Sequence, residues 1–158
     1  MSELSPSAAR VQAAIEAAGL NARVVIHTAP TRTAEEAAAA CGCSVAQIVK
    51  SLIFQGATSG KPYLLLVSGK NRVNEKAVGA QIGEALKRPG ADFVRAITGF
   101  AIGGIPPLGH VEPLKTFMDE DLLAFDVIWA AAGTPNAVFP AAPADLRRAA
   151  GAAVISVA

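Results

Sequence analysis

The sequence predicts an α/β domain of the α+β kind: a mixed, mostly antiparallel sheet or partial barrel surrounded by helices. Short β-branched runs alternate irregularly with helical segments, unlike the regular strand–helix repeat of a parallel sheet. At 158 residues, with no repeat or low-complexity linker, the chain is expected to be one domain spanning residues 1–158. Hydrophobic residues make up 52% and charged residues only 17%, which favours a packed core over disorder.

The N-terminal part is predicted to form a helix followed by a strand. Ser7–Ala18 places Val11 and Ile15 on one face, and Gly19 stands where such a helix ends. The β-branched run Arg23–His27 is typical of a strand. These segments therefore form the first helix and the first strand.

A capped helix comes next, and it is interrupted once. Thr33 and Glu36 have the spacing of a capping box, and Gly42 is placed to end the helix. Ser44 and Gln47 repeat the capping pattern, which predicts a short helical turn. The helix thus breaks at the glycine and restarts briefly.

The middle of the chain predicts a β-hairpin and then a helix. Lys50 heads the apolar run Ser51–Phe54, and Tyr63–Val67 is its expected partner across the turn Gly56–Gly60. The segment Asn71–Leu86 is expected to be largely helical. The first strand of the predicted hairpin therefore starts next to Lys50, and a helix follows its second strand.

The second half predicts two helices, four strands and a glycine- and proline-rich loop. The helices are Asp92–Ile97 and Ala144–Ala150, the loop is 103–110, and the strands lie near Val111–Met118, Asp126–Ala131, Val138–Phe139 and Ala153–Val157.

The composition limits the classes of protein to which this chain can belong. Fourteen basic and thirteen acidic side chains leave a formal charge of +1, so no global field attracts nucleic acid, although a local basic face is compatible with it. No apolar run approaches the ~20 residues that cross a bilayer, and Met1–Arg10 has no secretory pattern. Cys41 and Cys43 are expected to be reduced thiols. We expect a cytoplasmic protein that does not bind membranes.

Several common catalytic motifs are missing. The sequence has no Gly-x-Ser-x-Gly elbow, no His-Glu-x-x-His and no paired Cys-x-x-Cys, so neither an esterase-type serine nor a metal or other cofactor is predicted. The segment Gly56–Lys61 resembles a phosphate loop but is one residue short, and Pro62 replaces the hydroxyl residue. A hairpin turn is the favoured interpretation.

Two features are candidates for a site. In the loop 103–110, the N–H groups of Gly103, Gly104 and Ile105 can form a rigid array facing a carbonyl or oxyanion, or the loop can be a tight connector. Lys50 at the mouth of a strand can extend to water, or it can be a partly desolvated cation aimed at an anionic group. The residues alone leave both pairs of alternatives open.

Motifs along nearly the whole chain resemble the YbaK/ProX family of freestanding aminoacyl-tRNA deacylases, which is related to the editing domain of bacterial prolyl-tRNA synthetase. No single motif is decisive, but their order and separation are fairly specific. They are the helix start Thr33–Ala37, the run Ile48–Leu52, the Gly-x-x-x-Pro loop Gly103–Pro107 followed by Gly109 and His110, and Asp126-x-x-Trp129 leading to Ala132–Asn136.

The resemblance implies a trans-editing hydrolase that removes a wrong, small amino acid such as Ala, Cys, Ser or 2-aminobutyrate, expected on tRNA(Pro). It implies positioning without a metal or protein nucleophile, with Lys50 and the amides of Gly103, Gly104 and Ile105 as catalytic groups. The acceptor end of aminoacyl-tRNA is the implied partner. The basic residues between Lys70 and Arg95 can contact phosphates or can be a solvated helix face, and the small net charge suggests that a synthetase or elongation factor adds affinity. Implied substrate-binding residues are His27, Pro107, His110, Asp126 and Asn136.

Other interpretations stay open at this stage. His27 and His110 can be hydrogen-bonded structural residues, Asp126 a strand-end cap and Asn136 a turn residue. The chain can also be a non-enzymatic nucleic-acid or protein-binding module, or a small-molecule enzyme that uses Lys50 as a Schiff-base amine. The sequence identifies neither the amino acid removed nor the oligomeric state.

Overall fold

A computed structural model describes residues 4–158, so the first three residues of the stretch inspected for a secretory pattern lie outside the description. The helices are α1 (Pro6–Ala17), α2 (Ala34–Cys41), α3 (Glu75–Ile82), α4 (Ala91–Thr98) and α5 (Pro143–Ala150), with short 3-10 turns η1 (Val45–Gln47) and η2 (Glu120–Ala124). The strands are β1 (Val25–Ile26), β2 (Ile48–Gly56), β3 (Pro62–Ser68), β4 (Leu86–Lys87), β5 (Lys115–Asp119), β6 (Ile128–Ala131), β7 (Ala137–Ala141) and β8 (Ala153–Ile155).

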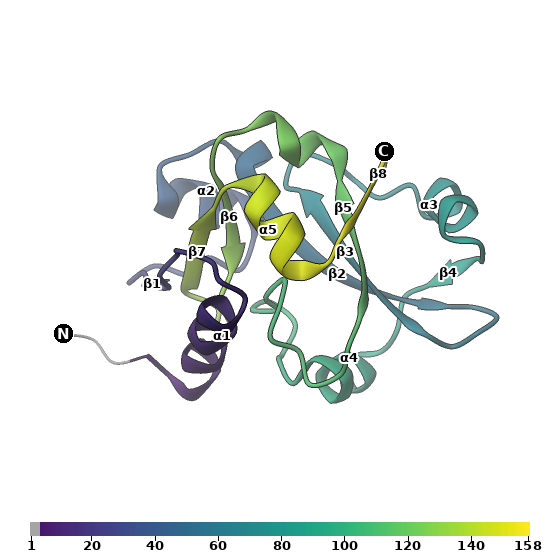
Figure 1. The fold of residues 1–158 in the computed structure, drawn as a ribbon, viewed down its shortest axis with the longest axis horizontal. Helices are drawn as coiled ribbons and strands as arrows, with labels where there is room; N and C mark the ends of the chain where they lie inside the picture. The colour runs from purple at the N-terminus through teal and green to yellow at the C-terminus, as the bar shows by residue number, and fades with distance from the viewer. Residues whose placement is uncertain (1–3) are drawn as a thin grey trace.

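Within residues 4–158 the strands form one mixed sheet of eight (Figure 1). Their order is β1-β7-β6-β2-β3-β5-β8, and β4 pairs with β2 off this path. Pairs β1·β7, β6·β7, β2·β3 and β2·β4 are antiparallel, whereas β2·β6, β3·β5 and β5·β8 are parallel. The predicted class and the mostly antiparallel mixed sheet are confirmed, and the sheet is open rather than a closed barrel.

The predicted capping signals form in the structure. The Thr33 hydroxyl accepts a hydrogen bond from the backbone N–H of Glu36, and Thr33 N–H donates back to the Glu36 carboxylate, both at 3.1 Å. Ser44 and Gln47 make the second box before η1. Gly42 ends α2 with φ +68°, a left-handed conformation that favours glycine. Local chemistry therefore determines this part of the fold.

Three predicted boundaries were wrong. The helix expected over 71–86 is only α3, because Asn74 caps its start and Gly83, at φ +112°, ends it, which frees Leu86–Lys87 to pair with β2. The strand expected from residue 111 begins at Lys115, where pairing with β3 starts. The strand expected over 23–27 pairs only at Val25–Ile26. In each case pairing or a cap, rather than composition, determines the end.

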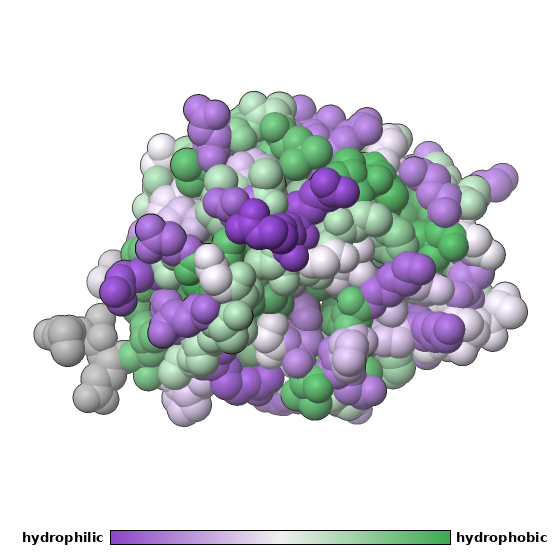
Figure 2. All heavy atoms as spheres, viewed as in Figure 1, coloured by the Kyte–Doolittle hydropathy of each residue, from purple (hydrophilic) through white to green (hydrophobic). Residues whose placement is uncertain are grey.

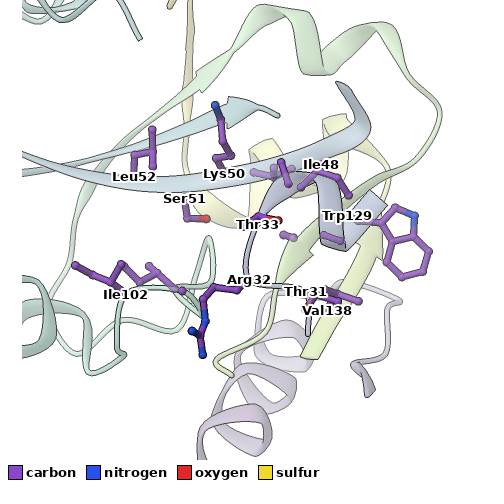
Figure 3. A pocket seen from close by; sticks show the side chains of 17 residues that line it. Thr31, Arg32, Thr33, Ile48, Lys50, Ser51, Leu52, Ile102, Trp129 and Val138 are labelled. Carbon is purple, nitrogen blue, oxygen red and sulfur yellow. The ribbon is translucent and has the colours of Figure 1, made fainter. Parts of the chain in front are cut away.

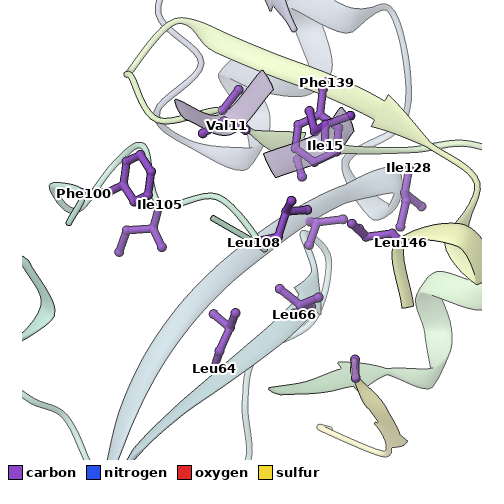
Figure 4. Packing of buried hydrophobic residues seen from close by; sticks show 14 of the residues in the cluster. Val11, Ile15, Leu64, Leu66, Phe100, Ile105, Leu108, Ile128, Phe139 and Leu146 are labelled. Atoms are coloured by element: carbon purple, nitrogen blue, oxygen red, sulfur yellow. The ribbon is translucent and has the colours of Figure 1, made fainter. Parts of the chain in front are cut away.

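Both faces of the central strands are buried. Leu64 and Leu66 of β3 pack with α1, α4 and α5 residues on one face, where Figure 4 shows Leu66 near Leu108 and Leu146. Leu65 and Val67 pack on the other face with a cluster that includes Val78 of α3. This alternation makes β2 and β3 the rigid centre of the molecule.

The outer surface mixes polar and apolar residues. Figure 2 shows the most hydrophilic side chains of this view gathered over α5, which carries the exposed Asp145–Arg148 ion pair at 3.2 Å. No helix within the described part of the chain is long and apolar enough to cross a membrane.

Glu84, just beyond α3, anchors the β2–β3 hairpin. Its carboxylate accepts hydrogen bonds from the backbone N–H groups of Thr58 and Ser59, the Ser59 hydroxyl and the Tyr63 hydroxyl, at 2.6–3.1 Å. The hydrogen bonds from Ser59 in particular lower the pKa of Glu84 from 4.5 to about 2. The charged form is therefore the one that holds the turn against α3.

Glu84→Gln is expected to lower the midpoint of thermal unfolding at pH 7, because the amide cannot accept all these hydrogen bonds. Because the folded pKa is depressed, the stabilisation is present above pH 4.5 and is lost as the pH falls towards 2. The difference between wild type and variant, followed by circular dichroism, should shrink over that window. The exposed Glu120→Gln is the control; an E84Q difference that does not change with pH contradicts the assignment.

Candidate functional site

A cavity of about 340 Å³ lies where the start of α2, the edge of β2 and the glycine loop meet. Figure 3 shows the side chains around it. A second hollow of about 240 Å³ shares Ser51, Leu52, Ile102 and Ile105 with it and continues towards Arg88. The first cavity is lined by Thr31–Ala34, Ala37, Ile48–Leu52, Ile102, Gly103, Ile105, Trp129–Ala131 and Val138.

The cavity exists because β2 lacks a neighbour along part of one edge. Pairing with β6 ends at Val49↔Ala130, and pairing with β4 begins only at Gln55↔Lys87. The opposite edge pairs with β3 along its whole length. Residues 50–54 therefore border an opening in the sheet.

Lys50 lines this cavity, and its side chain leaves β2 on the same side as Leu52 and opposite Ser51 (Figure 3). Its ammonium group donates a hydrogen bond to the backbone carbonyl of Asn71. Burial lowers the pKa of Lys50; the charge of Arg72 adds to this effect, while the charges of Glu35 and Asp119 oppose it. The lysine is thus a half-buried cation with a defined direction.

Asp119, at the end of β5, organises the partner of Lys50. It is 1% exposed, and its carboxylate accepts hydrogen bonds from the N–H groups of Ser68 and Asp121 and from the Asn71 side-chain amide, at 2.8–3.0 Å. The Asn71 amide also donates to Asp121 at 2.8 Å. Asn71 therefore links the buried carboxylate to the lysine, a connection that sequence reasoning missed.

The glycine loop is held by close backbone packing. Gly104 accepts a hydrogen bond from Gly133 N–H at 2.8 Å, and a Cβ on Gly104 would lie 2.9 Å from the Thr134 nitrogen. Gly103 has φ +104°. The loop and the 132–136 segment, which the sequence singled out separately, are therefore packed together.

The three predicted amide donors are not equivalent. Gly104 N–H is occupied by the Ala101 carbonyl at 3.2 Å. Within residues 4–158 the N–H groups of Gly103 and Ile105 have no such partner, and both residues line the cavity. Two of the three predicted donors are thus without a partner inside the described part of the chain.

Pro107 and His110 lie away from this cavity. They border a separate hollow of about 320 Å³, together with Glu112. The His110 Nε2–H donates to the Pro106 carbonyl at 2.7 Å, and burial lowers the pKa of the ring. In the structure, His110 therefore holds the loop, and it lies outside the lining of the first cavity.

The other three predicted substrate-binding residues also lie outside the cavity lining. The Asn136 amide donates to the His27 carbonyl at 3.0 Å, and His27 N–H donates to the Asn136 carbonyl at 2.9 Å. Asp126 is exposed in the turn before β6. The first two join β1 to the 132–136 segment.

Ser51, Arg32 and Trp129 line the cavity although sequence reasoning gave them no role. The aliphatic part of Arg32 approaches Gly103, since a Cβ there would lie 3.2 Å from Arg32 Cγ. One signal for Ser51 was present in the sequence, namely its place next to Lys50 in a predicted strand. Because neighbouring strand residues face opposite ways, Lys50 and Ser51 together present side chains on both faces of that strand.

Comparisons with known proteins identify the family of this chain. The family model for the aminoacyl-tRNA editing domain matches residues 28–149, so the chain belongs to this family. The resemblance to the YbaK/ProX deacylases is thereby confirmed.

Three individual relatives are similar to this chain. A crystal structure described as a candidate trans-editing enzyme for prolyl tRNA synthetase is 50% identical, with a TM-score of 0.93 over 98% of both chains. The proline–tRNA ligase of Limosilactobacillus fermentum is 30% identical over 99 residues, which are 60% of this chain and 17% of the ligase. The uncharacterized protein YwhH of Bacillus subtilis is 28% identical over 114 residues, 72% of each chain.

Gly104→Ala is expected to destabilise the protein by about 1–3 kcal/mol, because the added methyl group meets backbone atoms that cannot rotate away. Urea unfolding measures the loss. Gly90→Ala is the matched control, since a Cβ there has open space and φ is −73°. Equal stability of the two variants would contradict the close packing of the loop.

Asp119→Asn is expected to cost about 1–3 kcal/mol of folding free energy, because an amide leaves a buried hydrogen-bond donor or acceptor unmatched. The exposed Asp126→Asn serves as the control in the same urea titration. Unchanged stability of the Asp119 variant would show that the carboxylate does not hold this junction.

Proposed function

We propose that this chain hydrolyses the ester of mischarged tRNA in trans, with tRNA(Pro) carrying a small non-cognate amino acid as substrate. The observation that carries the proposal is the single cavity, in a member of the editing-domain family, that combines Lys50 with the free amides of Gly103 and Ile105. Alanine, cysteine, serine and 2-aminobutyrate are the candidate acyl groups. The likeness to a candidate trans-editing enzyme for prolyl tRNA synthetase supports tRNA(Pro).

The chemistry requires little from side chains. Water attacks the carbonyl carbon, the bond from that carbon to the ribose oxygen breaks, and the products are a free amino acid and a free ribose hydroxyl. The N–H groups of Gly103 and Ile105 stabilise the negative charge that develops on the carbonyl oxygen. A neighbouring ribose hydroxyl or the substrate side chain helps to deliver the attack. Positioning supplies the rest of the rate enhancement.

Lys50 and the loop take different parts of the substrate. The Lys50 ammonium projects on the side of β2 opposite Ser51, whereas Ile102 of the loop lies on the Ser51 side (Figure 3). We therefore assign the acyl carbonyl to the loop amides. Lys50 takes the terminal ribose or phosphate, where a partly desolvated cation interacts strongly.

The rest of the tRNA needs further contacts. Arg72 lies near enough to Lys50 to influence its pKa, so the basic residues from Lys70 onward can continue the phosphate path. A net charge of +1 is small for tRNA binding. We therefore propose that a synthetase or elongation factor contributes affinity, and that the protein acts in the cytoplasm, where tRNA is charged.

Lys50→Ala is expected to lower kcat/KM for misacylated tRNA(Pro) by about tenfold or more, because a charge-assisted contact to the substrate is lost. Purified wild type and variant are compared on tRNA(Pro) charged with alanine, cysteine, serine, 2-aminobutyrate or proline. Lys61→Ala, an exposed lysine in the hairpin turn, is the matched control and should keep full activity.

Two results would contradict this proposal. If wild type hydrolyses none of the charged tRNAs faster than buffer, the deacylase function is wrong. If Lys50→Ala is fully active, the function stands and the site assignment fails. Borohydride trapping of a carbonyl compound on Lys50 would instead indicate a Schiff-base enzyme.

A further inference from the structure

The open edge of β2 presents a defined set of main-chain groups. Hydrogen bonds from Gly69 N–H to the Ile48 carbonyl (2.7 Å) and from Gly56 N–H to the Lys61 carbonyl (2.8 Å) establish that even-numbered residues of β2 pair with β3. The N–H and C=O groups of Ser51 and Ile53 therefore point to the other edge. Neither β6 nor β4 reaches these two residues.

The side chain of Ser51 adds a further unpaired group at the same place. Among the described residues its hydroxyl oxygen is buried and has no hydrogen-bond partner. Ser51 lines both neighbouring hollows, and its hydroxyl lies on the side of β2 that faces Ile102 (Figure 3). A buried polar atom without a partner is unfavourable, so a ligand that pairs with it is the simplest reason for its presence.

The two walls of the cavity offer different groups. On the loop wall, Gly103 and Ile105 have free N–H donors, and among the described residues no free side-chain acceptor is found beside them. On the β2 wall, Ser51 adds two acceptors, its hydroxyl and carbonyl oxygens, next to its own N–H donor. A small ligand with a carbonyl acceptor next to a cationic donor satisfies both walls at once. The aminoacyl ester of the proposed substrate carries these two groups on adjacent carbon atoms.

We propose that Ser51 binds the α-ammonium group of the aminoacyl ester through its hydroxyl and carbonyl oxygens. This inference rests on the proposed deacylase function and makes Ser51 a specificity residue for a free α-amino group. The two nearby cations do not oppose it. Lys50 projects from the other side of β2 and is held by the Asn71 carbonyl, and the guanidinium of Arg32 extends away from Ser51 (Figure 3).

The test compares two esters of nearly equal size on tRNA(Pro): alanyl, which has the ammonium group, and lactyl, which has a hydroxyl in its place. Rates are divided by the rate in buffer, because the two esters differ in intrinsic reactivity. Wild type is expected to accelerate alanyl ester hydrolysis about tenfold more than lactyl ester hydrolysis, as for a hydrogen bond to a charged group.

Ser51→Ala is expected to lose most of that preference, because alanyl hydrolysis slows more than lactyl hydrolysis. Ser51→Thr keeps the hydroxyl and should retain the preference. Ser156→Ala, an exposed serine near the C-terminus, is the matched control. Because the Ser51 hydroxyl has no partner in the folded chain, S51A should also unfold at a temperature no lower than wild type.

The outcomes separate this inference from the proposed function. If wild type accelerates neither of these esters nor any other aminoacyl ester on tRNA(Pro), the deacylase function fails and the inference fails with it. If wild type accelerates both esters equally, or S51A keeps the alanyl preference, deacylation stands and the role of Ser51 is wrong. The comparison of the two esters with wild type needs no variant, so equal acceleration of both esters overturns the inference even if S51A does not fold.

Discussion

The candidate site depends on where the hydrogen-bond ladders of β2 stop. One edge of this strand pairs with β3 along its whole length, which keeps it rigid inside two hydrophobic clusters. The other edge pairs with β6 at one end and β4 at the other, and between them it has no partner strand. A strand that is fixed on one side and open on the other holds polar groups in place without neutralising them. The cavity and the free main-chain groups of Ser51 and Ile53 both follow from this arrangement.

Two separate sets of contacts hold the groups on the two faces of β2 beside its open edge. On one side, the buried Asp119 orients Asn71, whose carbonyl receives the Lys50 ammonium. On the other side, Gly104 packs directly on the Gly133–Thr134 backbone and presents its neighbours to the cavity. Each set consists of short contacts between main-chain or buried groups, which lose little entropy when substrate binds. Rigidity of this kind is what the proposed catalysis by positioning requires.

The capping boxes could be predicted from the sequence because their signals are local, whereas the candidate site was proposed from the resemblance to a known family. Thr33 with Glu36, and Ser44 with Gln47, form the expected capping boxes. Lys50 and the loop residues Gly103 and Ile105 line one cavity. Predictions for Pro107, His110, His27, Asp126 and Asn136 rested on the family resemblance, and the fold places these residues outside the lining of that cavity. Their roles in substrate binding remain predictions. The contacts that His110 makes hold the loop, and those between His27 and Asn136 hold β1.

By itself the sequence determined the class of fold, the capping boxes, the helix-ending glycine Gly42 and the resemblance to an editing domain. These features depend on backbone conformations and hydrogen bonds between residues close in the chain. Only the tertiary structure decided which strands pair with β2, where the pairing stops and on which side of the strand Lys50 and Ser51 lie. Strand register joins residues far apart in sequence, and a shift by one residue would exchange those two sides. The partnership of Asp119 with Asn71 was likewise invisible, because 48 residues separate them along the chain.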